Sequence, residues 1–237
     1  MSAATALADL ASLLADRTRA RFCLALLDGR AWTAGELADL AGVRPPTASE
    51  HLGKLVAGGL LAEERQGRHR YVRLASAEVA HLVEALAAHA APQAERPVGL
   101  RAVHASAALA GGRTCYDHLA GRLGVGITDA LVDRRLLVRD GGFALSAAGL
   151  AWMRSELGFE PARSRRPVAR DCLDWTERRT HLGGQAGAHI RTVLQERGWT
   201  RRRGDGRAVR LTEAGAAGLR SLLDLEMFED DAVVRSR

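Results

Sequence analysis

Cysteine and aromatic residues are scarce in this chain of 237 residues, and it has no long apolar run. Its three cysteines, Cys23, Cys115 and Cys172, are too few and too scattered for a disulfide framework, which agrees with a reducing compartment. No stretch of about 18 apolar residues occurs, and the N-terminus lacks the basic-then-apolar order of a secretory signal. We therefore expect a cytoplasmic protein without a membrane partner.

The signatures of common enzyme sites are also missing. No Gly-rich phosphate loop follows a strand, no serine elbow is present, and no pair of carboxylates can be placed. We expect Gly121 to Gly126 to form the turn of a helix-turn-helix, since helical residues flank it and no strand precedes it. The sequence thus predicts a protein that is not an enzyme. The alternative is an enzyme whose active site in the C-terminal half uses Asp117, His118 or Glu177.

Positive charge is present in excess, and nearly all of it is arginine. The 34 Lys and Arg residues outnumber the 28 Asp and Glu residues, which gives a formal net charge of +6. This balance favours a polyanionic partner such as nucleic acid, without proving one.

The first part of the chain shows the element order of a winged helix. Apolar spacing predicts two short helices between Ala6 and Leu27, and Thr33 with Glu36 forms a capping box that opens a third over 34–41. Gly42 supplies a turn. Proline disfavours the helical backbone conformation for the residue before it, but it fits the first turn of a helix. Pro45 and Pro46 therefore mark the start of a fourth helix, which is expected over 46–57. The remaining predicted elements are two strands, 60–65 and 71–74, around a basic hairpin at 66–70, and a long helix over 76–90.

The second part of the chain contains an internal repeat. Residues 137–149 resemble residues 199–215, and each stretch reads as a small Gly-containing hairpin that leads into a Ser- or Thr-capped helix. We therefore expect a mainly α fold with small β-hairpin wings. The predicted parts are an N-terminal winged helix-turn-helix domain (1–91), a linker (92–97), a C-terminal domain of two winged-helix-like half-repeats (98–228) and a tail (229–237).

The fourth helix is the candidate recognition helix. Its apolar face, Ala48, Leu52, Leu55 and Val56, is expected to pack against Leu37, Leu40 and Val43. Small polar groups on the other face suit a major groove, and the neighbouring basic side chains suit phosphates. The predicted DNA-contacting residues are Arg44, Pro46, Thr47, Ser49, Glu50, His51, Lys54, Arg65, Arg68, His69 and Arg70.

These segments resemble the ArsR-type (ArsR/SmtB) winged-helix repressors over about residues 5–90. The resemblance is carried by Leu13-Leu14-Ala15-Asp16-Arg17-Thr18-Arg19, by Glu36-Leu37-Ala38 and by Pro46-Thr47-Ala48-Ser49-Glu50-His51-Leu52-Gly53-Lys54-Leu55. It implies a homodimer in which the first helix and the helix over 76–90 pair across a two-fold axis. Such a dimer would present two recognition helices to a palindromic operator in double-stranded DNA. A winged helix used only for protein contacts is the alternative.

Two features depart from that family. The helix over 34–41 has no cysteine, so the thiolate sensor that the resemblance implies there is absent. Glu78, His81 and His89 on the long helix offer another set of metal ligands, at a spacing that differs from the family's.

The added C-terminal domain is expected to sense an effector that releases the repressor from DNA. If its two polar clusters face one another, Cys115, His118, Cys172 and His181 would form a tetrahedral site for a soft metal ion. The repeat places the two cysteines in comparable positions, so Cys115 and Cys172 are also candidates for a redox pair. Two more hypotheses stay open: structural burial of these clusters, with no metal at all, and binding of a small organic effector. The residues expected to hold that effector are Tyr116, Asp117, Trp175 and Arg178.

Overall fold

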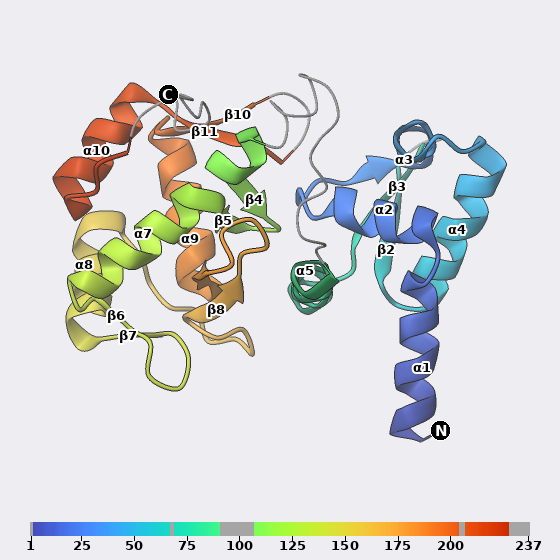
Figure 1. Cartoon of the computed structure of the whole chain (residues 1–237), viewed down its shortest axis with the longest axis horizontal. Coiled ribbons are helices and arrows are strands. Elements are labelled where there is room, and N and C mark those ends of the chain that lie inside the picture. Colours follow the sequence, from blue (N-terminus) through green and yellow to red (C-terminus); the bar gives the residue numbers. More distant parts are fainter. Residues whose placement is uncertain (1, 67–68, 91–106, 204–206, 228–237) are drawn as a thin grey trace, which may run out of the picture. The chain divides into compact units, whose positions relative to one another are not determined.

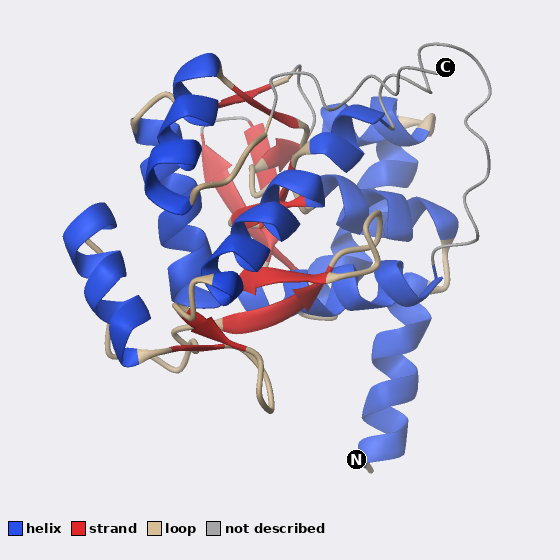
Figure 2. Cartoon of the chain, turned by 60° about the vertical axis from the view of Figure 1, so that its left-hand side comes forward, coloured by secondary structure: helices blue, strands red, loops and turns tan. Residues whose placement is uncertain are grey.

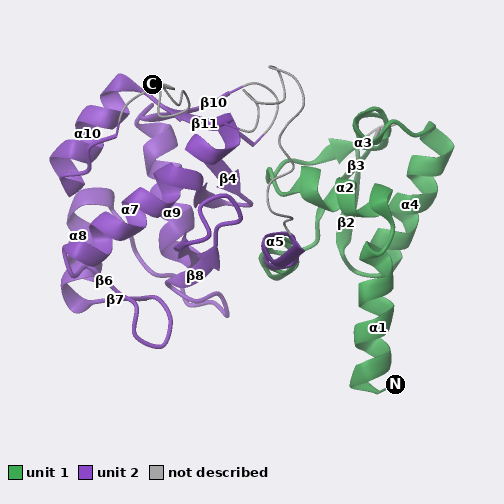
Figure 3. Cartoon of the chain, in the orientation of Figure 1, with its two compact units in different colours: residues 1–84 green, residues 85–237 purple. Residues whose placement is uncertain are grey.

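The computed structural model describes residues 2–66, 69–90, 107–203 and 207–227. It divides into two compact units, residues 1–84 and 85–237, with the boundary inside one helix (Figure 1, Figure 3). Helices are the main regular structure of the described residues and the strands are short (Figure 2). The predicted linker and tail lie outside the described residues. None of the described helices has the length and apolarity needed to cross a membrane.

Unit 1 has the element order predicted for a winged helix-turn-helix. Strands β1 and β2 both pair antiparallel with β3, which lies between them, and β2–β3 is the wing. The elements are α1 (Ala3–Leu14), α2 (Arg17–Leu26), β1 (Trp32–Thr33), α3 (Ala34–Ala41), α4 (Pro45–Ala57), β2 (Leu61–Gln66), β3 (His69–Leu74) and α5 (Ala77–Ala90).

Local chemistry sets the turn between α3 and α4. The Thr33 hydroxyl accepts a hydrogen bond from the Glu36 N–H at 3.3 Å, and the Glu36 carboxylate accepts one from the Thr33 N–H at 2.7 Å. This is the predicted capping box. Gly42 ends α3 in the left-handed region, at φ 67°. Pro45 then opens α4, one residue earlier than predicted.

Three of the four residues predicted for the inner face of α4 are buried, while Val56 is half-buried, and one correction is needed on the α3 side. Ala48, Leu52 and Leu55 are fully buried, as is Leu37 on α3, and α3 packs on α4. Leu40 was expected in this contact but is 48% exposed. The buried residues of α3 centre near Ala41, and Leu40 lies about 100° around the helix from the middle of that face.

Unit 2 contains the same sequence of elements twice: hairpin, helix, hairpin, capped helix. This arrangement confirms the expected half-repeats with small wings. The first half contains β4 (Arg113–Cys115), β5 (His118–Ala120), α7 (Gly121–Asp133), β6 (Leu137–Val138), β7 (Ala144–Leu145) and α8 (Ala147–Leu157). The second contains β8 (Arg170–Leu173), β9 (Thr180–Gly183), α9 (Gly184–Glu196), β10 (Thr200–Arg202), β11 (Val209–Leu211) and α10 (Glu213–Leu223).

The expectation for Gly121 to Gly126 was wrong. A strand, β5, does precede this segment, and Gly121 opens α7 directly from it at φ 73°. Gly184 opens α9 from β9 in the same way, at φ 78°. At either glycine an added Cβ would lie within 3 Å of a backbone carbonyl oxygen, so only glycine fits. β4 and β5 are three residues long and buried at every position, so they have no polar alternation to reveal them.

The two halves of unit 2 share one core. Buried side chains from both halves form a single cluster, which includes Leu123, Leu131, Met153, Ile190 and Leu219. Each hairpin packs on the helices of both halves: β5 contacts α9 and α7, and β9 contacts α7 and α9. β5 also contacts β9, so the hairpins β4–β5 and β8–β9 lie together.

Candidate nucleic-acid interface and candidate metal centre

The outer face of α4 is open to solvent. Thr47, Ser49, Glu50 and Lys54 are all exposed, while the opposite face is buried. Arg44 and Pro46, at the start of the helix, are exposed as well. Small polar groups therefore project from the N-terminal half of a helix that the core holds firmly, which is the geometry that major-groove entry needs.

Three of the predicted DNA-contacting side chains on α4 already have partners within the chain. The Lys54 Nζ lies 2.7 Å from the Glu50 Oε1, one helical turn away. The His51 Nδ1 lies 3.7 Å from the Asp16 Oδ1 at the start of α2. Since exposed ion pairs contribute little, Glu50 and Lys54 are free to exchange partners on a duplex, whereas half-buried His51 is tied to the scaffold.

The wing has a carboxylate among its arginines. The Arg70 Nη2 lies 2.6 Å from the Glu63 Oε2, and the Arg65 Nε lies 3.8 Å from the Glu63 Oε1. Arg65 is 78% exposed and Arg70 26% exposed, so Arg65 has the greater freedom to reach a phosphate. Arg68 and the side chain of His69 lie outside the described residues.

In unit 2 the predicted metal ligands lie together. Cys115 and His118 are a cross-strand pair of β4–β5, and Cys172 and His181 are the matching pair of β8–β9. The two sulfur atoms are 3.7 Å apart and the two histidine Nε2 atoms 3.1 Å apart. All four ligand atoms lie within 4.8 Å of one another, and all four residues are buried. We call these four residues the Cys/His cluster.

Each histidine of the cluster has a carboxylate behind it. The His118 Nδ1 lies 3.3 Å from the Asp117 Oδ1. The Arg166 guanidinium donates two hydrogen bonds to the Asp117 carboxylate, at 2.5 and 2.9 Å. The His181 Nδ1 lies 3.5 Å from Asp174, a contact that is not a hydrogen bond among the described residues. Carboxylates in this position orient a histidine that binds metal. Both rings present the Nε2 atom to the centre, where the two Nε2 atoms lie 3.1 Å apart.

Asp174 is the more deeply enclosed of the two carboxylates. It is fully buried, as is Arg113, whose Nη2 lies 2.9 Å from the Asp174 Oδ1. Asp174 also accepts hydrogen bonds from the N–H groups of Gly121 and Thr176. Burial alone would raise its pKa, but the Arg113 charge and these donors lower the pKa of Asp174 to about 2.

The charges around His118 favour its protonated form in the metal-free site. Burial acts to lower the pKa of His118, but hydrogen bonds with Asp117 and Cys172 outweigh it and raise the pKa to about 9. Burial likewise acts to raise the pKa of Asp117, and the bonds to His118 and Arg166 lower it to about 2. A cation in the cluster would compete with this proton.

The separations fit tetrahedral coordination. Bond lengths of about 2.3 Å to sulfur and 2.05 Å to nitrogen place two sulfurs about 3.8 Å apart and two nitrogens about 3.3 Å apart around one tetrahedral ion. The observed separations are 3.7 and 3.1 Å. Two soft thiols and two imidazoles are also the donor set that zinc-like ions prefer. Across the described ranges of a single chain, no other group of three or more His, Cys, Asp or Glu side chains lies close enough to hold a metal ion. A site formed by Glu78, His81 and His89 between two paired helices stays a prediction.

Comparison with known proteins identifies the family. A helix-turn-helix domain family matches residues 14–64. The uncharacterised HTH-type transcriptional regulator YdfF of Bacillus subtilis (strain 168) is 39% identical over 225 residues, which cover 93% of this chain and 98% of YdfF. This chain belongs to the HTH-type transcriptional regulators. The regulator thus has a relative that spans both of its units.

Solved structures similar to the regulator cover a smaller share of it. The transcriptional repressor BigR from Xylella fastidiosa is 30% identical, with a TM-score of 0.34, and covers 38% of this chain and 91% of its own. The homodimeric winged helix-turn-helix domain of Mb0332 from Mycobacterium bovis, a possible ArsR-family regulator, is 30% identical, with a TM-score of 0.34, and covers 37% of this chain and 80% of its own.

The residues predicted to hold an organic effector lie at turns of the same two hairpins. Tyr116 and Arg178 both have positive φ, at 57° and 53°. The Arg113 guanidinium stacks on Trp175, 4.8 Å from the ring centroid, and Asp117 is held by Arg166. These contacts stabilise the surroundings of the Cys/His cluster.

One signal for the cluster was missed in the sequence of the regulator. His118-Leu119-Ala120-Gly121 and His181-Leu182-Gly183-Gly184 occupy equivalent places in the two halves, each ending a strand and opening a helix. Aligning these two tetrapeptides would have paired the two histidines, as the repeat had already paired the two cysteines.

Proposed function

We propose that this regulator is a homodimeric repressor that binds a palindromic operator through α4 and the wing, and that an effector acting on unit 2 releases it. The exposed polar face of α4 supports the DNA contact. Exposed leucines support the dimer: α1 buries no residue, Leu7 on it is 68% exposed, and Leu86 on α5 is 46% exposed. Because its ligand is chromosomal DNA, we assign the protein to the cytoplasm.

The salt dependence of operator binding tests the DNA contact. Arg44→Gln and Arg65→Gln should each weaken binding to the upstream region of the regulator's own gene. Each should also reduce the slope of log K against log salt by about two per dimer, one for each protomer. Arg163→Gln, an exposed arginine in unit 2, is the control with the same charge change. Unchanged slopes for both unit 1 variants would contradict phosphate contact.

Light scattering tests the dimer. Leu7→Arg should yield a monomer that binds the operator weakly, because a charge at a buried interface position is costly. Val138→Arg, at a position in unit 2 that is 43% exposed, is the control and should stay dimeric. A dimeric Leu7→Arg protein would place the interface elsewhere.

The effector that the geometry of unit 2 supports best is a soft metal ion in the Cys/His cluster. The matching sulfur and nitrogen separations carry this proposal. The four side chains would tie the hairpins β4–β5 and β8–β9 together through such an ion, with Asp117 and Asp174 orienting the imidazoles. Release from DNA then requires the ion to bind the DNA-incompetent dimer more tightly than the DNA-competent one.

Elemental analysis together with a cobalt(II) titration tests the metal proposal. We expect roughly one thiophilic ion per chain and, with cobalt, the intense visible bands of tetrahedral thiolate coordination. Cys172→Ser should lose both signals, and Cys23→Ser should retain them. Equal metal binding by Cys172→Ser and the wild type would contradict the proposal.

The sulfur separation favours a redox pair as the second candidate. Hydrogen peroxide would oxidise the Cys115 and Cys172 thiols to one disulfide and be reduced to two water molecules. A thiol titre that falls by two on peroxide treatment, in protein that binds no metal, would favour this candidate.

We assign Asp117 and His118 to sensing and not to catalysis, because His118 belongs to the cluster and the Asp117 carboxylate is held between His118 and Arg166.

A further inference from the structure

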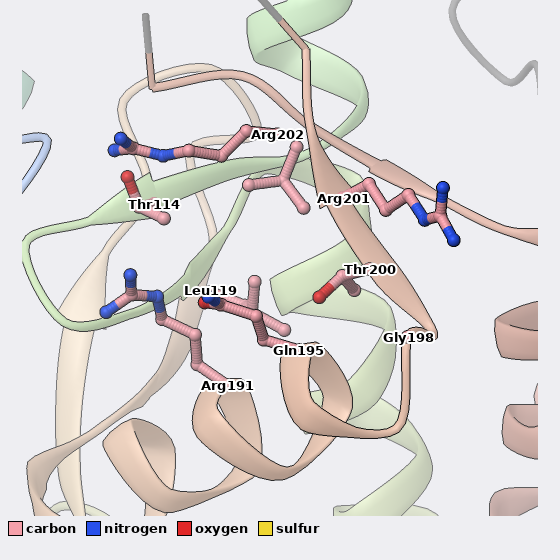
Figure 4. Close-up of a pocket in the computed structure, with 9 residues that line it drawn as sticks. Thr114, Leu119, Arg191, Gln195, Gly198, Thr200, Arg201 and Arg202 are labelled. Carbon is pink, nitrogen blue, oxygen red and sulfur yellow. The ribbon is translucent and has the colours of Figure 1, made fainter.

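Unit 2 contains a second candidate site, distinct from the Cys/His cluster. A cavity of about 450 Å³ lies among β4–β5, α9 and the β10–β11 hairpin (Figure 4). This volume lies within the range of small-molecule sites. We propose that the cavity binds a small organic anion, a carboxylate or a phosphate ester.

The cavity has a buried floor and a cationic rim. Thr114, Leu119, Thr200 and Val209 line it and are at most 8% exposed. The rim contains Gln195 and three arginines: Arg191, Arg201 and Arg202. No aspartate or glutamate among the described residues lines it. The leucine and valine suit a carbon skeleton, while guanidinium groups suit a carboxylate or phosphate group.

An unsatisfied hydroxyl on the floor points to a ligand. Thr114 is 2% exposed, and its Oγ1 has no hydrogen-bond partner in the described part of the chain. In Figure 4 this hydroxyl lies between the guanidinium groups of Arg191 and Arg202. A buried polar atom without a partner is costly, and an anion held by the arginines would accept its hydrogen bond.

Arg191 is the main candidate for the charged contact. It is half-buried on α9, and among the described residues no carboxylate forms an ion pair with it. Strand alternation places Arg202 on the same face of β10 as Thr200, and Arg201 on the other. Figure 4 shows Arg201 pointing away from Thr114. A duplex phosphate would meet the rim but not the Thr114 hydroxyl on the floor, which favours a small molecule over DNA.

The cavity and the Cys/His cluster share a wall. Thr114 pairs with Leu119, and the adjacent pair is Cys115 with His118. Adjacent pairs of a hairpin face opposite sides, so β4–β5 separates the anion from the cluster. If the metal proposal above holds, any effect of one ligand on the affinity of the other will be reciprocal.

Calorimetric titration of the full chain, first dialysed against a chelator, tests the anion site without reference to metal or DNA. The probes are citrate, benzoate, glucose 6-phosphate and inorganic phosphate at constant ionic strength, with glucose as the neutral control. We expect saturable binding of at least one organic anion. Comparing the affinity for citrate and benzoate with the affinity for glucose 6-phosphate will show whether the cavity prefers carboxylates or phosphate esters.

Three variants of the chain make this test specific. Arg191→Gln should raise the Kd of the bound probe roughly tenfold or more, while Arg163→Gln leaves it unchanged. Thr114→Val should weaken binding without lowering the thermal stability, because its hydroxyl has no partner to lose. Binding of none of the probes would overturn the proposal, as would equal effects of Arg191→Gln and Arg163→Gln. Displacement of a bound probe by duplex DNA, but not by any organic anion, would instead assign the cavity to nucleic acid and would also overturn it.

Discussion

The buried pair Arg113 and Asp174 offers the sharpest test of how unit 2 is held together. Both side chains are fully buried, with 2.9 Å between the Arg113 Nη2 and the Asp174 Oδ1. Asp174→Ala leaves the arginine charge in the core without its partner and removes the acceptor of the Gly121 N–H. Breaking a buried pair from one side costs about 3–5 kcal/mol. For a unit of this size that loss lowers Tm by roughly 6–20 °C.

Urea unfolding followed by circular dichroism measures this loss against a matched control. Asp129 also forms two arginine contacts, 2.6 Å to Arg139 and 2.7 Å to Arg179, but at the surface. Asp129→Ala should therefore cost at most about 1 kcal/mol. The double variant Arg113→Met/Asp174→Leu leaves no charge unpaired. Its loss of unfolding free energy should therefore be smaller than the sum of the losses for Arg113→Met and Asp174→Leu measured singly. Similar losses for Asp174→Ala and Asp129→Ala, or strict additivity in the double variant, would refute this reasoning.

Three further predictions follow from single side chains. Gly149→Ala would place a Cβ against the Leu136 carbonyl oxygen and should lower the free energy of unfolding in urea by about 1–3 kcal/mol. The added Cβ of Gly53→Ala meets nothing within 4 Å, so this control should raise the free energy of unfolding by up to about 1 kcal/mol. Burial raises the pKa of Cys23 to about 12, so its thiolate fraction at pH 8 is roughly a thousandfold lower than that of a thiol with an ordinary pKa. Iodoacetamide should therefore label Cys23 in urea but not in the native protein, and peptide mass spectrometry measures this labelling. Thr33→Ala removes the N-cap of α3 and should cost about 1 kcal/mol, and an unchanged urea midpoint would count against the capping box.

Sequence reasoning located α3, α4, the wing and α5 of unit 1 to within two residues, because their causes are local, but it began the first helix three residues late and missed β1. A capping hydroxyl, a left-handed glycine and two prolines act on the backbone beside them. The same holds for the capped helices of unit 2, which begin after Ser146 and Thr212. Leu40 shows where local periodicity is insufficient: spacing makes it a candidate for the core, but the partner helix covers a different arc of α3.

The strands beside the Cys/His cluster could not be predicted in this way. Each strand of β4–β5 has three residues, and both faces are covered, so neither length nor alternation distinguishes it from a loop. The cavity likewise gathers side chains from two hairpins and one helix, and no segment of the chain contains its pattern.

The amino-acid order alone determined a winged helix-turn-helix with an outward polar face, and it singled out two cysteines and two histidines as chemically suited to one another. Only the tertiary structure decided that these four side chains meet. The separation between Cys115 and Cys172 depends on the packing of each hairpin against the helices of both half-repeats, which long-range contacts produce and no neighbouring residue encodes.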